Sequence, residues 1–152
     1  MRARSRRLVA GSLLAATIGA ACSAGGSGSL TKAQVVRRAD AICTKANAAI
    51  ARMYRPDPDH SAATAAALAK VGGRQRAELR QLRGLTPPAT DASDYARWLT
   101  QIGLALDRAD ASRRAIAAAD VQAASEANRR GEQIRMDADR FAKAYGMRRC
   151  AA

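Results

Sequence analysis

Four segments of the sequence repeat small or apolar residues at intervals of three and four, which is the spacing of one face of an α-helix. They run from about residue 31 to 54, 61 to 83, 91 to 116 and 121 to 145. No segment alternates apolar and polar residues between turn signals, as a half-buried strand would. The connections are short enough for antiparallel neighbours, so the sequence predicts an all-α fold, an antiparallel up-down four-helix bundle.

Residues that favour helix ends stand at the boundaries of these segments. The expected N-terminal caps are Thr31 for the first helix, where Gln34 would complete a capping box, Thr90 or Asp91 for the third, and Asp120 for the fourth. Gly146 suits the left-handed position at the C-terminal end of the fourth helix. Gly72 and Gly73 lie inside the second segment, where each glycine costs about 1 kcal/mol relative to alanine. We expect one helix with a weak centre; a kink or a true break is the alternative.

The buried faces of the last two helices follow from the same spacing. In the third segment the expected face is Tyr95, Trp98, Leu99, Ile102, Leu106, Ala109 and Ile116. In the fourth it is Val121, Ala124, Asn128, Gly131, Ile134, Ala138, Phe141 and Tyr145.

The N-terminus has the features of an export signal. Residues 1–7 hold four arginines and no acid, and residues 8–21 hold no charge. A basic start, a short apolar run and small residues at its end are typical of a secretory signal peptide. A buried N-terminal helix is the alternative. The arginine pair Arg6-Arg7 partly resembles a twin-arginine signal, but the general secretory route is favoured.

Cys22 follows the small residues Ala20 and Ala21, and this junction resembles a bacterial lipobox, in which the cysteine thiol receives a diacylglyceryl group. Gly19 departs from the pattern, since leucine is commonest there. Ordinary cleavage nearby is the alternative. The sequence thus predicts a signal peptide over 1–21, a lipidated Cys22 with a Gly/Ser tether over 22–29, and a helical domain over 30–152, anchored to the outer face of the cell membrane.

The chain is strongly basic, with 26 Lys and Arg against 13 Asp and Glu. Because the first 21 residues hold four arginines and no acid, the remainder would carry a formal charge of +9 instead of +13. Such a charge attracts anionic lipid headgroups or other envelope polyanions. A nucleic acid is not expected as a partner, because the protein is predicted to be exported and few aromatic residues lie among the basic ones. Scattered arginine on solvated helix surfaces is the simpler explanation of the charge.

Two cysteines remain after Cys22. In an exported chain an even count indicates a disulfide, here between Cys43 and Cys150. The bond would close a loop of about 106 residues and contribute roughly 4–5 kcal/mol. It would tie the first helix to the chain after the fourth, as the bundle topology requires. A reactive or metal-binding pair is the alternative, but no CxxC spacing supports it.

Short motifs distributed over the chain resemble a group of uncharacterised small lipoproteins of high-GC Gram-positive bacteria. The matching pieces are Cys22, Leu30–Ala33, Ala39–Cys43 with Asn47, Leu85–Ala89, and Ala144–Met147 before Cys150. The resemblance implies a lipid anchor, helices and a disulfide. It implies no activity, no cofactor and no catalytic residue.

The sequence contains no recognisable catalytic or metal-binding motif. His60, the only histidine, lies in a turn rich in Pro and Asp, and cannot form a zinc site alone. No Glu-x-x-His motif is present for a di-iron bundle. We therefore expect no metal, no cofactor and no enzymatic activity.

Several polar residues lie on or beside the apolar faces: Asp40, Asn47, Asp107 and Asn128. Arginines on neighbouring helices, for example Arg135 or Arg140, could pair with them and set the helix register, which is the favoured interpretation; a ligand pocket is the alternative. The sequence thus favours a non-enzymatic module that binds a protein or an envelope polymer. A small-ligand carrier or sensor with a pocket between helices is the second hypothesis, and an enzyme of unrecognised type is the third.

Overall fold

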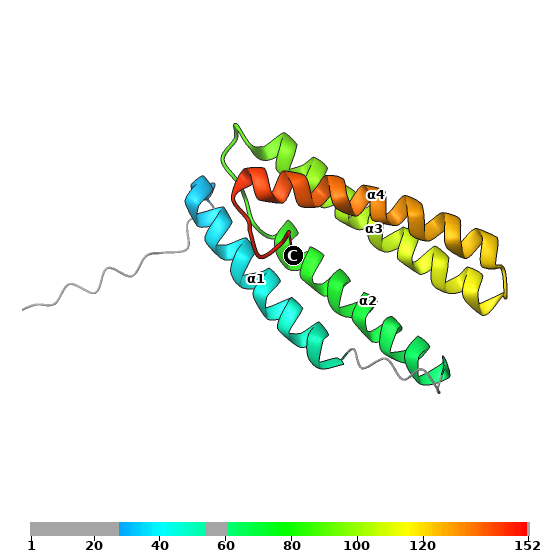
Figure 1. Cartoon of the computed structure of the whole chain (residues 1–152). Coiled ribbons are helices and arrows are strands. Elements are labelled where there is room, and N and C mark those ends of the chain that lie inside the picture. The colour runs from blue at the N-terminus through cyan, green and yellow to red at the C-terminus, as the bar shows by residue number, and fades with distance from the viewer. Residues whose placement is uncertain (1–27, 54–60, 152) are drawn as a thin grey trace, which may run out of the picture.

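The computed structural model describes residues 28–53 and 61–151, and over these it is an all-α four-helix bundle. Each helix runs antiparallel to the next in the chain, as predicted (Figure 1). The helices are α1 (Lys32–Met53), α2 (Ser61–Arg83), α3 (Ala92–Ala117) and α4 (Val121–Tyr145).

Several predictions from the sequence concern residues that the structure does not describe. The signal peptide over 1–21, the lipidated Cys22, most of the tether over 22–29 and the turn that contains His60 lie outside the described residues. They stay predictions. At the start of the described chain, the Leu30 amide donates to the Thr86 carbonyl oxygen (2.7 Å), which joins this segment to the connection between the second and third helices.

Three predicted helix ends are confirmed. The Thr31 amide donates to Oε1 of Gln34 (2.8 Å), and the Gln34 amide donates back to Oγ1 of Thr31 (3.3 Å), which is a capping box. The Asp120 carboxylate accepts from the Ala123 amide (2.9 Å) at the start of α4. Gly146 ends α4 with φ of 105°, a left-handed conformation that glycine adopts without strain.

Asp91 occupies the N-cap position of α3, but its side chain makes no capping bond. The carboxylate instead accepts from the hydroxyls of Tyr145 (2.8 Å) and Thr90 (2.9 Å). These two hydrogen bonds, the Tyr145 bond first, lower the pKa of Asp91. Asp91 therefore joins the start of α3 to the end of α4, a role that local sequence could not indicate.

The double glycine does not break α2, which is continuous through Gly72 and Gly73. Gly72 is buried, and a Cβ built on it would lie 3.1 Å from Nη2 of Arg113. The missing side chain thus lets the Arg113 guanidinium of α3 approach the backbone of α2. The prediction of one helix without a break is confirmed.

The core is densest at one end of the bundle, where four aromatic rings meet. The Tyr95 and Trp98 ring centroids are 5.3 Å apart, and Phe141 lies 6.0 Å from Trp98 and 5.5 Å from Tyr145. The Tyr95 hydroxyl donates to the Leu82 carbonyl oxygen (3.0 Å), which satisfies the buried polar atom. Burial raises the pKa of this tyrosine to about 12.

The predicted disulfide is confirmed: Cys43 and Cys150 are bonded, with an S–S distance of 2.05 Å. Two hydrogen bonds hold the same stretch of chain on α1. The Arg149 amide donates to Oδ1 of Asp40 (2.8 Å), and its carbonyl oxygen accepts from Nδ2 of Asn47 (3.1 Å). The residues after α4 are therefore fixed to α1 by one covalent and two polar contacts.

The expected burial of Ile116 and Val121 is wrong, because these side chains are 61% and 79% exposed. Both lie at the turn between α3 and α4, which projects away from α1 and α2 (Figure 1). Helical spacing alone does not show whether a residue near the end of a helix is covered by its neighbours. Asn128, expected on the buried face of α4, is likewise exposed.

We predict that replacing both cysteines, as in the C43A/C150A double variant, lowers the free energy of unfolding by about 4–5 kcal/mol, because the bond closes a long loop in the unfolded chain. Urea denaturation of the oxidised protein and of the variant measures the difference. Wild-type protein unfolded in reductant is the control and should match the variant. Equal stability of the oxidised and reduced proteins would contradict the prediction.

Candidate functional site

A partly open cavity of about 280 Å³ lies between the four helices, next to the disulfide. Part of its wall is apolar and comes from Leu79, Leu82, Trp98, Ile102 and Leu106. Alanines and one glycine complete the wall: Ala105, Ala109, Ala127, Gly131 and Ala138. These small side chains leave part of the space between the helices unfilled.

Polar side chains converge on the same cavity from three helices. They are Asn47 of α1, Gln75 and Glu78 of α2, and Asn128, Glu132, Arg135 and Asp139 of α4. A concave, mostly apolar site with a few converging polar groups is the usual form of a small-molecule site. The cavity is therefore the candidate functional site.

Glu78 is the most perturbed carboxyl group of the site. It is half-buried, and burial raises its pKa from the ordinary 4.5 to about 7, although the Arg74 charge one turn earlier opposes the shift. Among the described residues, no side chain forms a hydrogen bond or ion pair with its carboxylate. A carboxyl group that titrates near neutral pH and faces a cavity is a functional-site candidate.

Arg135 is fully engaged within α4. Its guanidinium donates through Nε (3.1 Å) and Nη2 (2.6 Å) to Glu132, and through Nη1 (2.6 Å) to Asp139. The hydrogen bonding between Arg135 and Glu132 lowers the pKa of Glu132 and raises the pKa of Arg135. Arg140 likewise pairs with Asp137 of its own helix. Arg135 and Arg140 are therefore the wrong examples, but the broader prediction is confirmed at Asp107, which pairs with Arg76 of the neighbouring helix α2 (3.0 Å).

The four polar residues singled out in the sequence have different positions. Asn47 and Asn128 line the cavity, whereas Asp40 binds the chain after α4 and Asp107 pairs with Arg76. Sequence analysis missed Glu78. The spacing of residues in α2 could have revealed it. Steps of four, three and four residues separate Val71, Gln75, Glu78 and Leu82, which places Glu78 on the same helix face as apolar residues.

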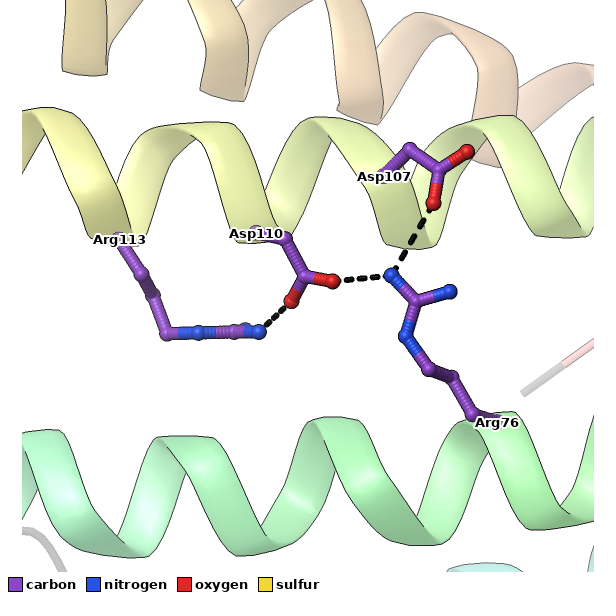
Figure 2. Close-up of polar contacts among 4 residues, drawn as sticks. All are labelled: Arg76, Asp107, Asp110 and Arg113. Carbon is purple, nitrogen blue, oxygen red and sulfur yellow. Dashed lines mark hydrogen bonds and ion pairs between the residues drawn. The ribbon is translucent and has the colours of Figure 1, made fainter.

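A second cluster of ionisable groups joins α2 and α3 beside the cavity. Figure 2 shows the Asp110 carboxylate between the guanidinium groups of Arg76 and Arg113. Arg76 also pairs with Asp107 (3.0 Å). Within residues 28–53 and 61–151, Arg76 makes the only ion pairs that link two different helices. The cluster therefore fixes the register of α2 against α3, and all its charges are paired.

Comparison with protein-family models, with curated proteins and with solved structures found no match. The resemblance to small lipoproteins of high-GC Gram-positive bacteria therefore stays a prediction. In the described part of the chain, no three His, Cys, Asp or Glu side chains are grouped as a metal ion requires. None of the helices within that part is long and apolar enough to cross a membrane.

We predict that Asp110→Asn destabilises the protein by about 1–3 kcal/mol, because it leaves two partly buried guanidinium groups without their shared carboxylate. Asp107→Asn is the matched control: the Asp107 side chain is 66% exposed, against 22% for Asp110, so its loss should cost less than about 1 kcal/mol. Urea denaturation of both variants measures this. Equal effects would contradict the shared role of Asp110.

We also predict that Glu78→Gln stabilises the protein at pH 8 by about 1–3 kcal/mol and has no effect near pH 4. The raised pKa means that the folded state binds the Glu78 proton more tightly than the unfolded state does. Wild-type stability therefore falls as the pH rises from about 4.5 to 7, and the full penalty is present above 7. Chemical denaturation of both proteins across this range measures the difference.

Glu126→Gln is the control for that experiment, because Glu126 pairs with Arg130 on the exposed face of α4 and does not line the cavity. If the difference in unfolding free energy between Glu78→Gln and wild type does not depend on pH, folding does not destabilise the charged form of Glu78 and the prediction is wrong.

Proposed function

We propose that this protein is an exported, lipid-anchored, non-enzymatic binding module that takes a small ligand in the cavity between its helices, as a carrier or a sensor. The observation that carries the proposal is the cavity itself. Ligand sites have volumes of roughly 300–1,000 Å³, and this cavity of about 280 Å³ lies just below that range. It suits a compact ligand with an apolar body.

The side chains around the cavity favour binding over turnover. In the described part of the chain, the residues that line it include no Ser, Thr, His or Lys, and both lining cysteines are joined in the disulfide. A nucleophile with an adjacent base is the usual requirement of covalent catalysis. The proposed role is therefore reversible binding.

The proposed location at the outer face of the cell membrane is inferred from the N-terminal sequence. A signal peptide over 1–21 and a lipid on Cys22 would hold the domain at the outer face of the cell membrane. The native disulfide supports an oxidising compartment, since such bonds are rare in the cytosol. The formal charge of +9 would favour anionic lipids or polymers near that surface.

A protein or an envelope polymer is the second candidate partner. The observation that favours it is the group of large apolar side chains exposed on α3 and α4 or the turn between them: Leu104, Ile116, Val121 and Met136. Because polar groups from three helices converge on the cavity, the cavity is the better-supported site.

We predict that Ala105→Phe, which places a phenyl ring in the cavity, abolishes ligand retention. The full-length protein, purified from the membrane fraction, is denatured and the released small molecules are identified by mass spectrometry. Wild type should release a compound that Ala105→Phe lacks. Ala96→Phe is the matched control, because Ala96 is exposed on the same helix and away from the cavity, so it should behave as wild type.

Circular dichroism checks that both variants are folded. The proposal fails if Ala105→Phe is folded and releases the same compounds as wild type, or if none of the three proteins releases a compound.

A further inference from the structure

We propose that the cavity selects a small organic cation, an amine with an apolar body, whose ammonium group pairs with the carboxylate of Glu78. This inference rests on the proposed binding function and adds the chemical class of the ligand. Three features of the described residues support it: the sign of the charge around the cavity, the unpaired state of the Glu78 carboxylate, and the apolar wall.

The cavity is acidic in a basic protein. The chain carries twice as many Lys and Arg as Asp and Glu. The lining has the opposite balance, with three carboxylates (Glu78, Glu132 and Asp139) and one guanidinium, that of Arg135. An anion entering the cavity would meet net negative charge, whereas a cation would be attracted.

The four charges around the cavity are not equally available. Arg135 neutralises much of the charge of Glu132 and Asp139 through its three hydrogen bonds. Glu78 faces these groups from α2 and has no such partner among the described residues. A ligand ammonium would supply the missing hydrogen-bond donor and compensate the desolvation of Glu78, which is the unfavourable part of its burial.

Among the described residues, the one cation whose charge acts on Glu78 forms no hydrogen bond or ion pair with its carboxylate. On α2, Arg74 acts through its charge alone, and the lining residues of α3 are apolar. From α1 the lining consists of Asn47 and Cys43, and Cys150 adds the other half of the disulfide. The cavity thus combines one available carboxylate with an apolar wall, which matches a ligand that has one cationic end.

Trp98 provides a direct signal for binding. It is the only tryptophan of the chain, lines the cavity and is only 1% exposed. A ligand that enters the cavity therefore changes the environment of a single fluorophore.

The test compares three probes with the same apolar body, phenylbutylamine, phenylbutanol and phenylbutyrate, titrated into the oxidised full-length protein at pH 8. Trp98 fluorescence is recorded, with calorimetry as the second measurement. The amine should bind about 10- to 100-fold more tightly than the alcohol, as a charge-assisted hydrogen bond implies, and the acid should bind least. In Glu78→Gln the amine and the alcohol should bind equally, whereas Glu126→Gln should keep the preference of wild type.

The preference for the amine should also decrease as the pH falls from 8 to 6, because protonation of Glu78 removes the charge, and it should not depend on pH in Glu78→Gln. If the alcohol or the acid binds as tightly as the amine in wild type, the cation proposal is wrong while the binding function stands. If no probe binds and the membrane-purified protein also releases no compound, the proposed function itself is wrong. Retention of the preference in Glu78→Gln would overturn the role of Glu78.

Discussion

The attachment of the C-terminal residues to α1 is the constraint on which the arrangement of the helices depends. α1 packs mainly on α2, and α4 mainly on α3, so the fold consists of two helical hairpins (Figure 1). The Cys43–Cys150 bond links the first hairpin to the chain that follows the second. The Arg149 amide donates to Asp40 and the Arg149 carbonyl oxygen accepts from Asn47, so these hydrogen bonds hold the same contact and the bundle is closed at this end.

Closure at one end explains why a cavity exists. Trp98, which packs against other aromatic rings, lines the cavity together with the disulfide, while much of the remaining wall is alanine and glycine. Side chains of this size cannot fill the centre of a bundle whose backbone separation is set elsewhere. The Asp110 ion pairs hold α2 against α3 beside this space.

Most of the fold could be predicted because it depends on local chemistry. The Thr31–Gln34 capping box, the Asp120 cap and the left-handed Gly146 are all defined by residues within a few positions of one another. The disulfide could be predicted because only two cysteines follow Cys22. The role of Asp91 could not be predicted in this way. Its carboxylate accepts a hydrogen bond from Tyr145, which is 54 positions away in the sequence, and local spacing gives no sign of that contact.

By itself the sequence determined the helices, their ends, the disulfide pairing and the net charge, because each follows from residue type and short-range spacing. Only the tertiary structure decided which residues face the cavity, why Glu78 titrates near neutral pH, and why Ile116 and Val121 are exposed. The physical reason is the same in each case. Helical spacing identifies a face, but burial and desolvation depend on how near the neighbouring helices come to that face.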